Sequence, residues 1–297
     1  MRLTYFITQQ DSGKKVEVIL KYKLNLSGRH IKKLKYIGRI LCNSSPVHVN
    51  HIVKEGDIVD VLIDSEEDET DIIPEDLPIF IIYEDDGLIV LNKQPGIVVH
   101  PTSSHLSGTI ANALAYHFKG KGEKRKIRPV SRLDRDTTGI IVFAKNQYVQ
   151  EQLIQQMASK IFIKEYIGVV SGLVSNRTGT IDMPIDRKPG SIMERHISPS
   201  GLRAVTHYEV IEYLNDATCL RFYLETGRTH QIRVHCKAIG HPLIGDTLYS
   251  DIPSGLISRQ ALHASYVSFV HPVTQTRIQL SAPIPQDMKD LMEILRK

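Results

Sequence analysis

Residues 130–139 (VSRLDRDTTG) place two arginines and two aspartates directly before 140–144 (IIVFA), an apolar run typical of a buried strand. A carboxylate buried without a partner costs several kcal/mol. We therefore expect Asp134 or Asp136 either to pair with a cation in the folded chain or to have a catalytic role.

Two carboxylates spaced by two residues would share one face of an ideal strand, as the acid and nucleophile of a glycosidase or nucleosidase would require. This segment precedes the strand, however, and it is rich in turn-forming residues, so the relative orientation of Asp134 and Asp136 is open. A single catalytic carboxylate is the better hypothesis. The ordinary alternative for each aspartate is that it caps a turn.

Length and charge distribution predict two domains joined by a linker. At roughly 150 residues per domain, 297 residues suggest about two. Residues 1–64 hold 11 Lys or Arg against 6 Asp or Glu, and residues 65–76 hold 7 acids and no base. We predict a small basic domain at 1–64, an acidic linker at 65–77 and a second domain at 78–297. The basic domain is expected to meet phosphate, with a solvated charged surface as the alternative.

The basic domain has one clear helix signal. Ser27 is placed as an N-cap, and Ile31 and Leu34 form an apolar stripe at helical spacing. The opposite face carries four candidate RNA-binding residues, Arg29, Lys32, Lys33 and Lys35. Short strands are predicted within 2–20, and a hairpin from 47–51 and 56–63. A basic helix beside a small hairpin resembles the RNA-binding domain shared by a ribosomal small-subunit protein and many RNA-modifying enzymes.

The second domain is predicted to be α+β, with a largely antiparallel sheet and flanking helices, because strands outnumber helices and are linked mostly by short turns. The turn 85–87 (DDG) joins two strands. The predicted strands lie at 79–83, 88–92, 161–171, 205–214, 217–225 and 264–270, and the predicted helices at 111–117 and 147–160.

A second group of polar residues follows the strand that ends near Gly227. Arg228 and Arg233 are expected near the start of a helix, where anions are favoured, and an arginine facing a carboxylate keeps it ionised. His230 and His235 are five residues apart rather than the four that would place two metal ligands on one helical face. They are predicted to be structural or to face RNA.

A third pattern lies in the predicted strand at 161–171, where Lys164 and Tyr166 share one face. A tyrosine that projects into a cleft can stack on a base or handle a proton. The alternative is an ordinary tyrosine in the core of a sheet.

These segments, in this order, resemble the RluA/RluD family of pseudouridine synthases. The resemblance spans about residues 80–285. It rests on LNKQPG at 91–96 with HP at 100–101, RLDRDTTG at 132–139, KEY at 164–166, GRTHQIR at 227–233, HPLIGD at 241–246 and QALHA at 260–264. Each motif alone is weak, but a chance match of all of them in order is very unlikely.

The resemblance implies an isomerase with the pseudouridine synthase fold, which converts uridine in RNA to pseudouridine without a metal or other cofactor. It assigns the catalytic carboxylate to Asp134, an active-site ring that stacks on uracil to Tyr166, and the arginine that pairs with the aspartate to Arg228. Arg132 resembles the residue that fills the gap when the base flips out of its stack. Asp136 and Thr138 are predicted to tie down the loop. Ser131 stands where the family often has histidine.

Arg233 and His230 are expected to contact RNA. Ribosomal RNA is the expected substrate, with transfer RNA as the competitor. Three cysteines without a CxxC pair, and the absence of an apolar run of about 20 residues, predict a cytoplasmic protein with no metal site and no membrane span. A monomer is expected.

Overall fold

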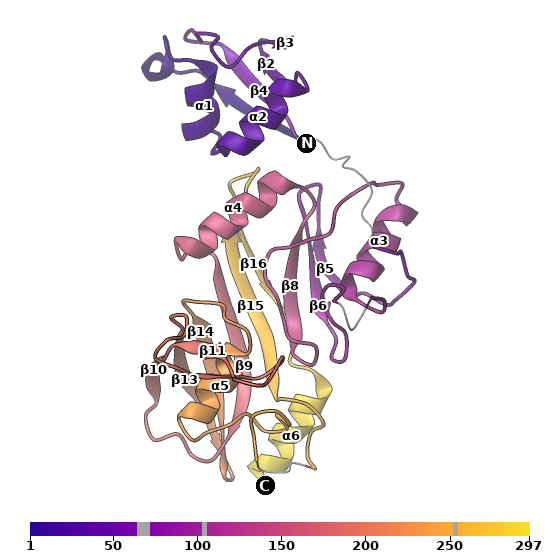
Figure 1. Cartoon of the computed structure of the whole chain (residues 1–297), viewed down its shortest axis with the longest axis vertical. Helices are drawn as coiled ribbons and strands as arrows, with labels where there is room; N and C mark the ends of the chain where they lie inside the picture. Colours follow the sequence, from indigo (N-terminus) through magenta and orange to yellow (C-terminus); the bar gives the residue numbers. More distant parts are fainter. Residues whose placement is uncertain (64–71, 103–105, 252–254) are drawn as a thin grey trace.

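The computed structural model describes residues 1–63, 72–102, 106–251 and 255–297. Its first part is a four-stranded antiparallel sheet in the order β1-β4-β2-β3, covered by two helices (Figure 1). The strands are β1 (Arg2–Phe6), β2 (Ile40–Cys42), β3 (Ser45–Pro46) and β4 (Ile58–Leu62), and the helices are α1 (Val16–Tyr22) and α2 (Gly28–Tyr36), with a short 3-10 turn at Gln9–Asp11. We call this part the amino-terminal unit.

Helix α2 confirms the prediction made from Ser27, whose hydroxyl accepts a hydrogen bond from the His30 amide. The strand predicted across 16–20 is wrong. Val16, Ile19 and Leu20 are fully buried, and their spacing by three and four residues gives α1 an apolar face that alternation alone does not reveal.

The predicted hairpin is also wrong, because 47–51 is not a strand. Strand β4 pairs instead with β1 and β2, and places Val61 opposite both Leu3 and Ile40. Central position in this sheet buries Val59 and Val61 completely.

The second and larger sheet has ten strands and follows the order β10-β13-β14-β9-β15-β8-β6-β5, with β16 beside β15 and β7 beside β8. Its strands are β5 (Ile81–Glu84), β6 (Leu88–Lys93), β7 (Arg128–Pro129), β8 (Thr138–Ala144), β9 (Ile163–Ser171), β10 (Thr178–Asp182), β13 (Val205–Leu214), β14 (Ala217–Leu224), β15 (Leu262–Val270) and β16 (Arg277–Ser281). A separate pair, β11 (Ile185–Arg187) and β12 (Arg195–Ile197), forms a small hairpin.

Only one pairing in this sheet is parallel among the strands that the structure describes, that of β8 with β15. It comprises two residue pairs, His263 with Thr138 and Ala264 with Gly139. Gly139 has φ +105°, and a Cβ there would collide with the carbonyl oxygen of Ala264. The predicted α+β class with a mostly antiparallel sheet is confirmed.

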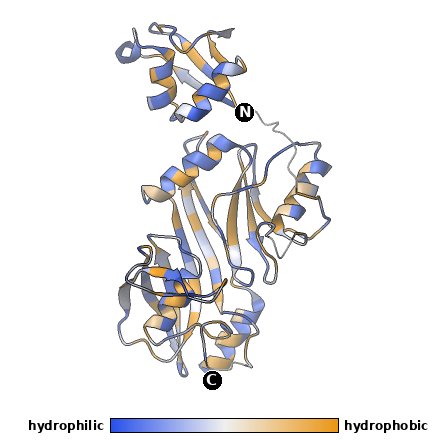
Figure 2. Ribbon diagram, viewed as in Figure 1, coloured by the Kyte–Doolittle hydropathy of each residue, from blue (hydrophilic) through white to orange (hydrophobic). Residues whose placement is uncertain are grey.

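Helices flank the large sheet, and Figure 2 shows the central strands as mostly orange and pale while the helices carry a blue outer face. Strand β8 is buried along its whole length. The helices are α3 (Ile110–Gly120), α4 (Gln147–Ala158), α5 (Gln231–Ala238) and α6 (Gln286–Arg296). The turn at 85–87 and the helices predicted near 111–117 and 147–160 agree with β5–β6, α3 and α4, whereas α6 has no counterpart among the predicted elements.

The amino-terminal unit lies against α4 (Figure 1). The His30 ring contacts the edge of Tyr148 with centroids 6.3 Å apart, and Gln152 donates a hydrogen bond to the Asn25 carbonyl at 2.7 Å. Apolar side chains of both parts belong to one buried cluster. Part of the predicted linker, 65–71, lies outside the described residues, so the boundaries at 64 and 78 stay predictions.

No helix in the described parts of the chain is long and apolar enough to cross a membrane. Cys42, Cys219 and Cys236 are all buried free thiols.

Candidate active site

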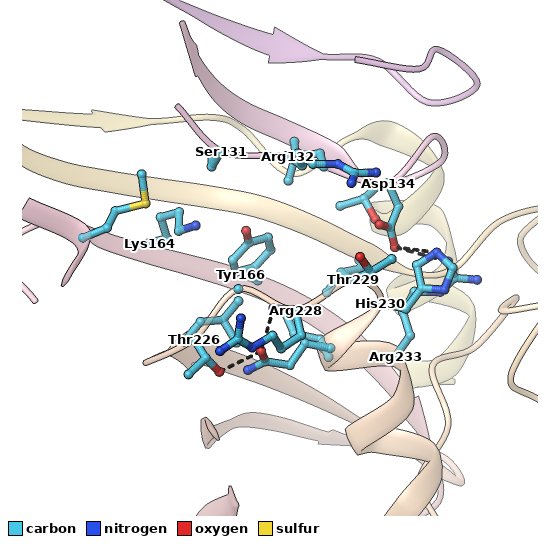
Figure 3. A pocket seen from close by; sticks show the side chains of 18 of the residues that line it. Ser131, Arg132, Asp134, Lys164, Tyr166, Thr226, Arg228, Thr229, His230 and Arg233 are labelled. Carbon is cyan, nitrogen blue, oxygen red and sulfur yellow. Dashed lines mark hydrogen bonds and ion pairs between the residues drawn. The ribbon is translucent and has the colours of Figure 1, made fainter. Parts of the chain in front are cut away.

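A pocket of about 430 Å³ opens where the strand ends of the large sheet meet the start of α5 (Figure 3). Four cationic side chains and two carboxylates line it, so its charge is net positive; these are Arg132, Lys164, Arg228, Arg233, Asp134 and Glu225. Asp134, Tyr166 and Arg228 all line the same pocket, as the sequence predicts.

The loop that carries Asp134 is held from three sides. Within the loop, the Thr137 amide donates to the Asp134 carbonyl at 3.2 Å. The ammonium of Lys93 donates to the Arg135 carbonyl at 2.6 Å and to two carbonyls of its own turn. Arg259 donates to the Asp136 carbonyl at 3.2 Å. These contacts fix the loop backbone, so the position of the Asp134 side chain is set before any ligand arrives.

The two residues predicted to tie down this loop make such contacts. The Asp136 carboxylate accepts hydrogen bonds from its neighbour Arg135. The hydroxyl of Thr138 is buried and lies 2.9 Å from Nδ1 of His263 on β15. The Asp136 carboxylate is therefore engaged in an ion pair with Arg135. The geometry gives no support to the alternative in which Asp134 and Asp136 act as a catalytic pair.

Asp134 pairs with Arg233, not with Arg228. Nη1 of Arg233 lies 3.2 Å from Asp134 Oδ2, while its Nε and Nη2 bind the two oxygens of Asp246 at 2.7 and 2.8 Å. Asp246 is fully buried, and its two oxygens fix the orientation of the guanidinium. Burial by itself would lower the pKa of Arg233, but the two carboxylates outweigh it and raise that pKa. The Nε, Nη1 and Nη2 atoms of Arg233 each bind a carboxylate of the protein, which gives this residue a role in positioning Asp134, and its predicted contact with RNA stays a prediction.

Arg228 is exposed at the rim of the pocket. Its Nε donates to the Arg203 carbonyl at 3.1 Å, and its amide donates to the Gln231 side chain at 3.0 Å. The pairing of Arg228 with Asp134 is thus corrected. The reason is local: the segment between Gly227 and α5 turns Arg228 outward, and the first turn of the helix points Arg233 inward.

His230 lies beside Asp134, with Nε2 at 3.8 Å from Oδ2. It stands at the N-cap of α5 with φ +58°, a left-handed conformation that is uncommon for a residue with a side chain. Its Nδ1 lies 2.8 Å from the hydroxyl of Tyr249, and that hydroxyl also accepts a hydrogen bond from the Arg195 amide at 2.8 Å. Burial lowers the pKa of His230, so the ring is neutral near pH 7.

Tyr249 therefore touches both side chains that flank Asp134. Its ring packs edge-on against His230, and the guanidinium of Arg233 lies 5.0 Å from the ring centroid. Within the described parts of the chain, the contacts that Arg233 and His230 make with the aspartate both go to Oδ2. Oδ1 is the oxygen left to face a ligand.

Tyr166 projects from β9 at the floor of the pocket and is 5% exposed. Burial, and then the negative charge of Asp134, raise the pKa of its phenol. The ring is consequently a neutral surface at physiological pH, in the same pocket as Asp134.

Three residues of this site carried no sequence prediction of their role: Tyr249, Asp246 and Gln231. Gln231 is buried and binds both Val205 and Thr206, which shapes the segment before α5. Asp246 is the last residue of the HPLIGD motif. The motif therefore indicated that Asp246 matters, but it did not indicate that Asp246 binds Arg233. Nothing near Tyr249 in the sequence indicates that it reaches His230.

The remaining predicted residues lie where expected or stay untested. Arg132 is exposed on the pocket wall, and Arg29, Lys32, Lys33 and Lys35 are exposed on α2. His235 is fully buried between Thr206 and the Met183 carbonyl, which fits the structural role predicted for it. Among the described residues one group could present three metal ligands, Cys42, His51 and Asp57, and it lies away from this pocket in the amino-terminal unit.

Comparison with known proteins identifies the family of this chain. Residues 87–238 match the family model described as RNA pseudouridylate synthase. The chain belongs to this family. A relative at 38% identity over 81% of the chain, from Pasteurella multocida, is named ribosomal large subunit pseudouridine synthase D, which confirms the RluA/RluD resemblance. The chain is thus an isomerase that converts uridine in RNA to pseudouridine.

Two further relatives align with almost the full length of this pseudouridine synthase. The protein named uncharacterized RNA pseudouridine synthase YjbO of Bacillus subtilis is 41% identical over 91% of this chain and 96% of its own length. The ribosomal large subunit pseudouridine synthase D of Vibrio cholerae is 36% identical over 100% of this chain and 96% of its own. The solved human RNA pseudouridylate synthase domain containing 1 shares the fold, with a TM-score of 0.56 at 23% identity over 74% of this chain and 95% of its own.

Proposed function

We propose that this pseudouridine synthase acts on large-subunit ribosomal RNA and that Asp134 is its catalytic carboxylate. The observation that carries the assignment is the geometry of Asp134: Arg233 binds its Oδ2, and the side chain lines a cationic pocket together with the buried ring of Tyr166. Cleavage of a glycosidic bond needs such a carboxylate near the anomeric carbon.

In this reaction the bond between the uracil nitrogen and the ribose carbon breaks, the base turns, and its carbon 5 bonds to the sugar. Asp134 Oδ1 would meet the reacting nucleotide, and Arg233 would keep the carboxylate ionised and oriented. The flipped uracil would stack on Tyr166. Because burial and Asp134 raise the pKa of the Tyr166 phenol, we assign this residue to stacking and orientation rather than to proton removal from carbon 5.

The ribosomal substrate is inferred from two supports. Relatives from Pasteurella multocida and Vibrio cholerae are named ribosomal large subunit pseudouridine synthase D. The amino-terminal unit exposes a basic helical face on α2, suited to the phosphates of a structured RNA. We further propose that the protein acts as a monomer in the cytoplasm, and that residues 1–64 form an RNA-binding domain.

The test is release of tritium from RNA that carries [5-³H]uridine, because carbon 5 loses its hydrogen when it bonds to the sugar. We expect the wild-type protein to release tritium from transcribed large-subunit ribosomal RNA, and Asp134→Asn to release none while it still binds the same transcript. Full activity of Asp134→Asn would refute the catalytic assignment. Release from transfer RNA transcripts alone would refute the ribosomal one.

A further inference from the structure

Lys164 differs from Lys93 and Lys145, the two buried lysines among the described residues. Lys93 is 1% exposed, and its ammonium donates to three carbonyl oxygens. Lys145 is 3% exposed, and its ammonium binds Glu84 at 2.6 Å. Lys164 is half-buried on β9, and no hydrogen bond or ion pair to it is found within the described parts of the chain. A sheltered ammonium without an acceptor is costly, so a ligand is expected to complete it.

Lys164 lies where a ligand in the pocket could reach its ammonium group. Lys164 lines the same pocket as Asp134, and Figure 3 shows it next to Tyr166, on the side of the ring away from the aspartate. Two residues along a strand place Lys164 and Tyr166 on one face, about 7 Å apart. An RNA atom bound by Lys164 would therefore belong to a nucleotide next to the one that stacks on Tyr166. It would not belong to the glycosidic bond that reacts.

The acids of the pocket are already engaged. Asp134 binds Arg233, and Glu225 binds Lys160 at 3.0 Å and His207 at 2.9 Å. The neighbouring Glu165 points to the opposite face of the sheet, toward Arg221. Across the strands, Val267 on β15 stands opposite Lys164 and carries no charge. These acids are therefore paired elsewhere, and no carboxylate is paired with Lys164 among the described residues, so we expect its anion to come from a ligand.

We propose that Lys164 forms a phosphate subsite, which binds the backbone of a nucleotide flanking the target uridine. This inference rests on the proposed function, since the RNA that enters the pocket brings phosphate as its anion. Lys164 would thus position RNA without touching the reacting atoms, and its removal should raise KM rather than lower kcat.

The acid-base behaviour of the site agrees with such a role. Burial lowers the pKa of Lys164 to about 8, so the free side chain carries most of its charge at pH 7 and little at pH 9. A bound phosphate favours the charged form. The contribution of Lys164 to affinity is therefore nearly full at pH 7 and falls as the pH rises through about 8. Among the titratable groups that line the pocket, Tyr166 has a raised pKa, and Glu225 and His230 have lowered ones, so none of these three changes charge between pH 7 and pH 9.

The experiment compares the full-length protein with Lys164→Met, which removes the charge, and Lys164→Arg, which keeps it at every pH used. Lys289→Met is the matched control, because Lys289 is an exposed lysine on α6, outside the pocket lining. Tritium release from the transcribed large-subunit ribosomal RNA gives kcat and KM at pH 7 and pH 9.

At pH 7 we expect Lys164→Met to raise KM about 10-fold with kcat little changed, as for the removal of one charge-assisted hydrogen bond. Lys289→Met should leave both constants as in the wild type. Between pH 7 and pH 9 the KM of the wild type should rise about 5-fold relative to Lys164→Arg, because phosphate binding raises the pKa of Lys164 by about one unit when the charge is worth 10-fold in affinity. The ratio cancels titrations common to both proteins, including that of uridine.

The outcomes separate this inference from the proposed function. An active wild type with an unchanged KM in Lys164→Met, or with a decrease confined to kcat, would overturn the phosphate subsite alone. A wild type that releases no tritium from any RNA would overturn the proposed function and the subsite with it. Binding of the transcript by Asp134→Asn with and without Lys164→Met checks the affinity change without turnover.

Discussion

The two ends of the pocket are built differently. At the Asp134 end, Arg233, Asp246, His230 and Tyr249 form a closed set of contacts, each 3.8 Å or shorter between hydrogen-bonding or charged atoms. At the Lys164 end, the ammonium has no protein partner among the described residues. The difference indicates that Asp134 and its partners, which we assign to chemistry, are held in place without RNA. Lys164, which we assign to RNA binding, would gain its partner only when RNA binds.

After Asp134→Asn, the largest effect is expected for Arg233→Lys. Lysine keeps the charge but cannot bind Asp246 at two oxygens and Asp134 at the same time. We expect kcat to fall about 100-fold, as for a displaced catalytic group, and the free energy of unfolding to fall by about 3 kcal/mol because a buried ion pair is broken. Tritium release and urea denaturation measure the two quantities. A large rise of KM with normal kcat would break the comparison, since it would place Arg233 among the RNA contacts.

Next comes Tyr249→Phe. The change keeps the ring against His230 and Arg233 but removes the hydroxyl that binds Nδ1 of His230 and the Arg195 amide. We expect kcat to fall about 10-fold with KM nearly unchanged, the equivalent of one hydrogen bond.

A matched control is Tyr213→Phe, which deletes a hydroxyl that donates to the Val174 carbonyl at 3.1 Å, outside the pocket lining. It should retain wild-type kcat. Equal decreases in the two variants would mean that Tyr249 acts only through stability.

A smaller effect is expected for Arg228→Gln. Arg228 is exposed at the pocket rim, so its replacement should raise KM about 3-fold and leave kcat unchanged. A fall of kcat comparable to that of Asp134→Asn would show that Arg228, rather than Arg233, pairs with the aspartate during the reaction.

The smallest effect on catalysis is expected from the basic face of α2. Replacement of Lys32, Lys33 and Lys35 by glutamine should leave kcat unchanged and reduce the salt dependence of binding. The slope of log affinity against log salt should fall by about 0.7 to 0.9 for each phosphate that these lysines no longer neutralise. Filter binding over a range of salt concentrations measures the slope. An unchanged slope would remove α2 from the surfaces that bind RNA.

The sequence was sufficient wherever the determinants of structure are local. Ser27 fixes the start of α2, and the turn 85–87 fixes the β5–β6 pair. It failed in α1, where Val16, Val18 and Leu20 alternate as in a strand. The buried contacts of Val16, Ile19 and Leu20 with the rest of the unit decide the helix, and those contacts are long-range.

The candidate site divides in the same way. Order and spacing of the motifs were enough to gather Asp134, Tyr166 and Arg228 around one pocket. The pairing of Asp134 with an arginine 99 residues later depends on which way α5 starts, and two arginines five residues apart on the same segment do not reveal it. Tyr249 and Asp246 act through contacts of this kind too, so their roles emerge only in three dimensions.

The position of β15 has a consequence for how the enzyme is made. In the sheet it stands between β9 and β8, yet it is synthesised after both, at residues 262–270. Asp134 precedes β8 and Tyr166 lies on β9, so the strand that joins their two halves of the sheet leaves the ribosome late. A nascent chain that already contains Asp134, Tyr166 and Arg233 still lacks the strand that brings them together. We therefore expect the two halves of the pocket to come together only after β15 has been synthesised.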